Sequence, residues 1–81
     1  MVTFGRTALG RPLHAVLATQ EGIADVARLP GTGKPTVLAQ CGIHSGEIDG
    51  KDAGLMLLRD LAFGGKAGLL DQANLLFIPV L

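Results

Sequence analysis

The stretch that most constrains the fold is residues 37–60, where an apolar run passes directly into a helical pattern. The run is apolar from residue 36 to residue 43 apart from Gln40, which is typical of a central strand covered on both faces. Over residues 48–63, apolar side chains recur at three- and four-residue spacing and predict an amphipathic helix. A glycine pair at 64–65 is expected to end that helix. A strand that leads directly into a helix indicates an α/β fold.

Three further strands are expected around this unit. After a Gly-Arg-Pro turn signal, residues 13–19 predict a strand, and residues 23–29 predict a weaker second strand that completes a hairpin. Residues 75–81 predict another buried strand, after a connection with one helical turn at residues 68–72. The central strand and the last strand should be parallel, joined by a right-handed crossover through the helix. The expected fold class is therefore α/β with a partial mixed sheet: a β-hairpin, a central strand, a crossover helix and a parallel strand.

The loop at residues 30–35, PGTGKP, contains a Gly-Thr-Gly-Lys sequence that resembles part of a phosphate-binding loop. Two residues argue against this interpretation: Arg28 stands where the motif needs its first glycine, and Pro35 stands where it needs a serine or threonine. A phosphate-binding loop also opens a helix, whereas a strand is expected here. We interpret the segment as a plain loop between the hairpin and the central strand.

The composition suits one small domain with an excess of apolar surface. The 81 residues are 48% hydrophobic and 17% charged, with a mean hydropathy of +0.43. A chain of this length buries only about 60–65% of its unfolded surface, so the excess indicates faces that further chain or another subunit covers. Seven basic and seven acidic side chains cancel, and no basic stripe occurs, which argues against a nucleic-acid partner. No apolar run approaches the ~20 residues of a membrane span, so we expect no membrane partner.

His44 and Glu47 lie three residues apart at the transition from the central strand to the helix. Ligands of α/β sheets bind beyond the carboxyl ends of the strands, and an imidazole with a carboxylate there suits zinc. The alternative, a solvent-facing loop histidine beside a helix-capping glutamate, stays open on spacing alone. Cys41 is interpreted as a small buried apolar residue, with a metal contact or an oxidation site as the minor alternative. His14, inside a predicted strand, is interpreted as structural or solvent-facing.

Three segments stand out in order along the chain: residues 6–13 (RTALGRPL), 41–47 (CGIHSGE) and 77–81 (FIPVL). Together they resemble the N-terminal part of the zinc metallocarboxypeptidases related to carboxypeptidase A. In that family a hairpin with a Gly-Arg-Pro turn precedes a buried strand, a His-x-x-Glu supplies two zinc ligands, and a later strand ends in Val-Pro-Val-like residues. The resemblance implies that His44 and Glu47 are ligands of one zinc ion. It also implies a parent enzyme that hydrolyses the C-terminal bond of a peptide substrate with a zinc-activated water.

The chain also departs from that family. Gly46 and Ile48 stand where the digestive members have arginine and tryptophan, so the substrate contacts of that arginine are not carried over. The resemblance further implies a third ligand, a downstream histidine, together with a general-base glutamate and groups that hold the substrate carboxylate, and none of these has a position here. We therefore expect residues 1–81 to be a single, truncated N-terminal portion of a peptidase catalytic domain, with no catalytic residue of its own. Alone, it should bind zinc poorly, be inactive and self-associate through uncovered strand edges.

Two other functions stay open. An acylamino-acid hydrolase of the aspartoacylase or succinylglutamate desuccinylase kind shares the zinc pair and the fold, although the Gly-Arg-Pro hairpin argues against it. Alternatively, the chain is a non-catalytic interaction domain whose apolar surface binds a partner. An Asn-Pro-Asp-Gly segment, a later histidine and a late glutamate beyond Leu81 would favour the peptidase.

Overall fold

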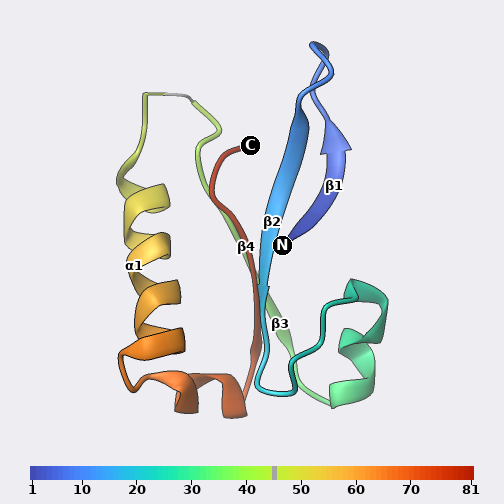
Figure 1. The fold of residues 1–81 in the computed structure, drawn as a ribbon, viewed down its shortest axis with the longest axis vertical. Coiled ribbons are helices and arrows are strands. Elements are labelled where there is room, and N and C mark those ends of the chain that lie inside the picture. Colours follow the sequence, from blue (N-terminus) through green and yellow to red (C-terminus); the bar gives the residue numbers. More distant parts are fainter. Residues whose placement is uncertain (45) are drawn as a thin grey trace.

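The computed structural model describes residues 1–44 and 46–81, which form one mixed sheet, one α-helix and two 3₁₀-helices (Figure 1). The strands are β1 (Val2–Arg6), β2 (Pro12–Ala18), β3 (Thr36–Gln40) and β4 (Asn74–Ile78). The helices are η1 (Val26–Thr32), α1 (Asp49–Phe63) and η2 (Ala67–Asp71). The expected α/β class with a partial mixed sheet is confirmed.

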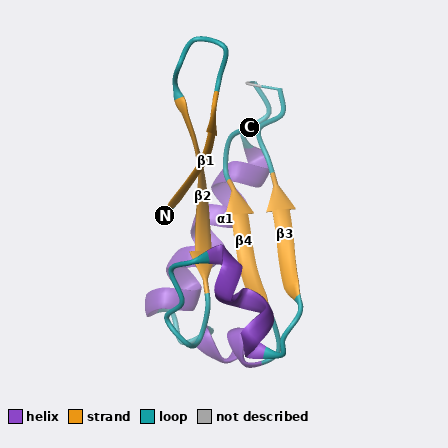
Figure 2. Ribbon diagram, turned by 90° about the vertical axis from the view of Figure 1, so that its right-hand side faces the viewer, coloured by secondary structure: helices purple, strands orange, loops and turns teal. Residues whose placement is uncertain are grey.

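The four strands follow the order β1-β2-β4-β3 across the sheet (Figure 2). Strand β2 is antiparallel to both β1 and β4, whereas β3 is parallel to β4. Phe77 of β4 therefore lies between Val16 of β2 and Ala39 of β3. Helix α1 connects β3 to β4 and covers one face of the sheet, while η1 lies on the side of the other face (Figures 1 and 2). The predicted parallel pair with its crossover helix is confirmed.

Helix α1 spans Asp49–Phe63, close to the predicted residues 48–63, and has two acidic side chains in its first turn. There they interact favourably with the positive end of the helix dipole. The glycine pair ends the helix as expected: the N–H groups of Gly64 and Lys66 both donate to the Asp60 carbonyl, at 3.0 and 3.1 Å. Gly65 has a φ of 80°, which glycine adopts without steric cost. No helix in the described ranges is long and apolar enough to cross a membrane.

The last strand is shorter than predicted. It begins at Asn74 and ends at Ile78, because Pro79 has no N–H to continue the ladder. The helical turn predicted before it is present as η2.

The predicted strand at residues 23–29 is wrong, since most of this segment belongs to the 3₁₀-helix η1. Asp25 caps η1 by accepting a 3.0 Å hydrogen bond from the N–H of Ala27. Pro30 lies inside η1, where its fixed φ suits the helix and where its missing N–H would weaken a strand. Local capping and a proline therefore outweigh the weak apolar alternation on which the strand prediction rests.

The hairpin partner of β2 is instead β1, a strand that the sequence does not predict. The turn between them is closed by a 2.8 Å hydrogen bond from the Thr7 N–H to the Arg11 carbonyl. Gly10 occupies this turn with a φ of 80°, so the Gly-Arg-Pro signal does mark a hairpin turn. The pairing register shifts between Thr3 and Gly5, a bulge that breaks the alternation by which β1 could be recognised.

Strand β3 is central in the prediction, yet within the described part of the chain it is at an edge of the sheet. It is also shorter than predicted, ending at Gln40 rather than at residue 43, because Gly42 turns the chain with a φ of 67°. Val37 is 52% exposed and Leu38 is 57% exposed, although these side chains leave opposite faces of the strand. The apolar pattern is thus that of a covered strand, while the described residues leave both of its faces partly open.

The core is correspondingly small. Its buried apolar side chains are Ala15, Leu29, Leu61, Phe77 and Ile78. Large apolar side chains that remain exposed include Val37, Leu38, Leu55, Met56 and Phe63. The sheet and α1 therefore present apolar surface outward as well as to each other.

Candidate metal centre

His44 and Glu47 both lie in the segment between the carboxyl end of β3 and the beginning of α1. This segment is at the end of the sheet where the carboxyl ends of β3 and β4 meet (Figure 1). Glu47 precedes the helix by two residues rather than standing in its first turn. Its N–H donates a 3.0 Å hydrogen bond to the His44 carbonyl, which turns the chain back and brings the two side chains to one side.

The two side chains contact each other directly. Nδ1 of His44 is in hydrogen-bond contact with Oε1 of Glu47, and the side chains are 80% and 69% exposed. An imidazole nitrogen and a carboxylate oxygen thus meet at an open surface, where a cation can approach from solvent. Both belong to the donor types that zinc prefers. The predicted pair is therefore brought together, and its donor chemistry fits zinc.

The strand side of this segment is held by the end of β4. The Cys41 N–H donates to the Ile78 carbonyl at 2.9 Å, and the Leu81 N–H donates to the Cys41 carbonyl at 3.1 Å. These bonds extend the β3–β4 ladder beyond the regular strands. Sequence reasoning missed this support, because it links residues almost forty positions apart.

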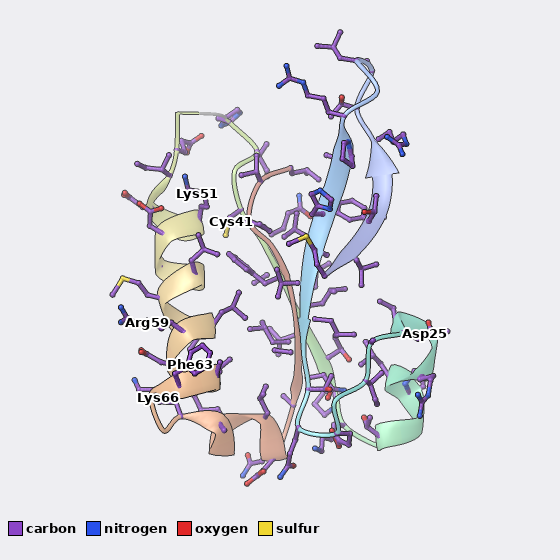
Figure 3. The ribbon with its side chains drawn as sticks, viewed as in Figure 1. Asp25, Cys41, Lys51, Arg59, Phe63 and Lys66 are labelled. Carbon is purple, nitrogen blue, oxygen red and sulfur yellow. The ribbon has the colours of Figure 1, made fainter. Side chains whose placement is uncertain are left out.

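A shallow depression of about 400 Å³ adjoins the pair. Its lining includes Gln40, Cys41, Gly42, His44, Glu47 and Gly50. Cys41 is a free, half-buried cysteine between the sheet and the N-terminal turns of α1, where its Sγ atom lies beside Gly50 (Figure 3). Among the residues described, no three His, Cys, Asp or Glu side chains are grouped so that they could hold a metal together. His44 and Glu47 are the predicted donors, and Cys41 lies in the lining of the same depression.

His14 lies on β2, in the antiparallel hairpin rather than at the strand-to-helix segment. Its Nδ1 is 3.2 Å from the hydroxyl oxygen of Thr3 on the neighbouring strand, in an exposed position. This agrees with its interpretation as a structural or solvent-facing residue.

Lys34, the lysine of the Gly-Thr-Gly-Lys sequence, has a structural role at the opposite end of β3. Its ammonium group is 2.7 Å from Oε2 of Glu21, 3.2 Å from Oε1 of Gln20 and 3.1 Å from the Leu70 carbonyl. The hydrogen bond from Lys34 holds the pKa of Glu21 below its ordinary value. A strand follows this loop at Thr36, as expected for a plain loop rather than a phosphate-binding one.

In comparison with protein families, the family model described as zinc carboxypeptidase matches residues 1–81. Comparison with curated proteins and with solved structures found no match. The family match covers the hairpin, the parallel strand pair and the segment with His44 and Glu47. Because this match spans residues 1–81, the chain belongs to the zinc carboxypeptidase family.

Proposed function

We propose that His44 and Glu47 are two ligands of the zinc ion of a metallocarboxypeptidase, and that residues 1–81 are an N-terminal portion of its catalytic domain. The observation that carries this proposal is the contact between Nδ1 of His44 and Oε1 of Glu47 at the end of β3. Membership of the zinc carboxypeptidase family supports the same assignment. The reaction would be hydrolysis of the C-terminal peptide bond of a peptide substrate.

The two residues have complementary roles in this proposal. His44 offers a neutral nitrogen donor and Glu47 an anionic oxygen donor, so the pair reduces the charge of a divalent cation without cancelling it. Zinc, when bound, supplies Lewis-acid chemistry that polarises the scissile carbonyl and makes water more acidic. The high exposure of both side chains leaves room beside them for a substrate and for further protein ligands.

The pair is incomplete as a catalytic centre. Catalytic zinc sites hold the metal with three protein ligands and keep a further position for water or substrate. Within residues 1–44 and 46–81, no third donor is grouped with His44 and Glu47. We infer that the third ligand and the general base come from another part of the catalytic domain, and that this chain alone is inactive.

Calorimetric titration of the 81-residue chain with zinc tests the proposal. We expect one site with a dissociation constant of micromolar or weaker, because only two ligands are present. His44→Ala and Glu47→Gln should each abolish measurable binding, while His14→Ala, which removes the other imidazole, should leave it unchanged.

Two results would overturn the proposal. The first is binding that survives both His44→Ala and Glu47→Gln. The second is binding much tighter than micromolar in the original chain, which would require a complete ligand set within these residues.

A further inference from the structure

Helix α1 approaches the sheet closely at two glycines, Gly50 and Gly54, one helical turn apart. A Cβ atom on Gly54 would lie 2.1 Å from Cζ and 2.4 Å from Cε1 of Phe77. A Cβ atom on Gly50 would lie 2.9 Å from Sγ of Cys41. Since Cβ atoms essentially never approach other heavy atoms within 3.0 Å, neither position accepts a side chain unless the helix or its neighbour moves.

The neighbours of these glycines have little freedom to move. Phe77 is 2% exposed and lies in the middle of the sheet, with β2 on one side and β3 on the other. The Cys41 backbone is tied to β4 through hydrogen bonds to Ile78 and Leu81, which hold its Cβ atom, and this atom would lie 3.4 Å from a Cβ atom on Gly50. An added methyl group would therefore displace α1 rather than the sheet.

A displacement of α1 would act directly on the proposed zinc ligands. Gly50 follows Glu47 by three residues, and Cys41 precedes His44 by three. The segment that carries His44 and Glu47 thus begins near Cys41 and ends near Gly50, and the contact between these two residues holds its two ends together. Figure 3 shows Cys41 between the sheet and the N-terminal turns of α1.

A third glycine fixes the strand side of the segment. Gly42 has a φ of 67°, and a Cβ atom there would lie 2.8 Å from the Val80 Cα and 2.9 Å from the Pro79 carbonyl oxygen. The backbone before His44 therefore packs tightly against the residues that follow β4. With that side fixed, the position of Glu47 relative to His44 depends on how closely α1 packs on the sheet.

We propose that Gly50 and Gly54 are positioning residues that set the placement of Glu47 relative to His44. Glycine inside a helix lowers its stability relative to alanine, so two glycines on one face need a compensating role. That role is to let α1 pack close enough to the sheet for the Glu47 carboxylate to reach the His44 imidazole. This proposal rests on the proposed zinc site for its functional meaning, although the positioning itself can be measured without metal.

The test compares Gly54→Ala and Gly50→Ala with a control, Gly31→Ala. Gly31 has a negative φ, and the Cβ atom that this substitution adds would meet no other atom within 4 Å. The metal-free measurement is the nuclear Overhauser contact between the His44 ring and the Glu47 side chain. The metal measurement is the zinc affinity from shifts of the His44 ring resonances. We expect Gly54→Ala to lose the contact and to weaken zinc binding about tenfold, which is the lower end of the loss seen when groups that orient metal ligands are changed. Gly31→Ala should change neither.

Rescue separates positioning from a general loss of stability. Phe77→Leu removes the ring atoms nearest to Gly54 and should restore the contact and the affinity in Gly54→Ala. Cys41→Ala should rescue Gly50→Ala and should not rescue Gly54→Ala. If Gly54→Ala fails to fold, Gly50→Ala with its rescue partner carries the same test, because its clash is milder.

The outcomes are distinguishable from failure of the proposed function. A folded Gly54→Ala or Gly50→Ala chain that keeps the contact between His44 and Glu47 overturns the positioning proposal, whatever the zinc result. Loss of the contact, with pair-specific rescue but no zinc binding even in the original chain, supports positioning and contradicts the zinc assignment.

Discussion

At the scale of single residues, His44 and Lys34 differ in how far along the chain their partners lie. His44 and Glu47 are three positions apart and contact each other directly, so local spacing indicates that the two side chains can meet, although spacing alone does not assign them a metal. The partners of Lys34 lie 13 to 36 positions away, so they are not visible in its sequence neighbours. Those neighbours suggest only a phosphate-binding loop, which the structure does not form. Residue roles that rest on distant partners are set by the fold and cannot be predicted from local sequence.

The Lys34–Glu21 ion pair predicts a pH dependence of stability. Because the folded-state pKa of Glu21 is lowered from 4.5, its contribution is present above that pH and is lost as the pH falls through the lowered value. In urea unfolding, we expect Glu21→Gln to be less stable than the original chain at pH 6 and to converge with it well below pH 4.5. Lys34→Met should remove the same pH dependence. A constant difference between the original chain and Glu21→Gln across this range would contradict the assignment.

Asn74 predicts a contrast between two substitutions. It is 1% exposed, its Nδ2 donates to the Thr32 hydroxyl at 3.1 Å, and its Oδ1 has no partner among the described residues. We expect Asn74→Ala to lower the free energy of unfolding by about 1–3 kcal/mol, because a hydrogen bond is lost and a cavity is left. Asn74→Leu should cost less, since it fills the space and removes the unpaired oxygen.

The Thr32 hydroxyl keeps two other bonds in both variants, one to the Leu29 carbonyl and one from the Lys34 N–H. Equilibrium unfolding in urea measures the contrast. A larger loss for Asn74→Leu than for Asn74→Ala would contradict this expectation, because it would mean that the site cannot accommodate the leucine side chain.

At the scale of helices and strands, an element can be predicted when its apolar periodicity is long and its end signals are clear. The apolar pattern of helix α1 repeats over about four turns and has a clear end signal in the glycine pair, and its observed bounds differ from the prediction by one residue. Strand β1 is five residues long with a bulge, and only its pairing with β2 makes it a strand. The 3₁₀-helix η1 resembles a strand in sequence because its apolar residues alternate weakly, whereas its capping aspartate and internal proline determine its structure.

Packing of α1 on the sheet predicts unequal effects along the helix. Leu61 is 7% exposed, whereas Leu57 on the same helix is 37% exposed. We expect Leu61→Ala to lower the free energy of unfolding by about 2–5 kcal/mol, through lost burial and a residual cavity. Leu57→Ala should cost clearly less. Equal losses in urea unfolding would contradict the expected difference, which rests on the unequal burial of the two side chains.

At the scale of the whole molecule, the chain exposes more surface than a self-contained protein of its mass. Its accessible surface is 5452 Å². A compact monomer of this mass exposes about 4,600 Å². The excess of roughly 850 Å² equals one side of a standard protein interface. Much of the uncovered surface is apolar and includes β3, whose sequence pattern is that of a covered strand. The apolar sequence pattern of β3 is that of a strand with other protein on both faces, and the described residues leave these faces partly exposed.

This uncovered edge predicts self-association of the isolated chain. An edge strand with unpaired backbone groups and exposed apolar side chains is a template for pairing with another copy. In sedimentation velocity at increasing concentration, we expect a shift from monomer toward dimer and larger species. Val37→Lys and Leu38→Lys, which place charge on the two faces of β3, should reduce it, while Phe63→Lys, far along α1, should have less effect. A strictly monomeric profile at high concentration would contradict this expectation.

X-ray absorption at the zinc edge, on the 81-residue chain loaded with one equivalent of zinc, tests the assignment of His44 and Glu47 most directly. We predict nearest neighbours of nitrogen and oxygen only, at about 2.0–2.2 Å, with more distant scattering from a single imidazole that is lost in His44→Ala. A sulfur neighbour near ~2.3 Å, which would identify Cys41 as a ligand, or scattering from two imidazoles, would contradict the assignment.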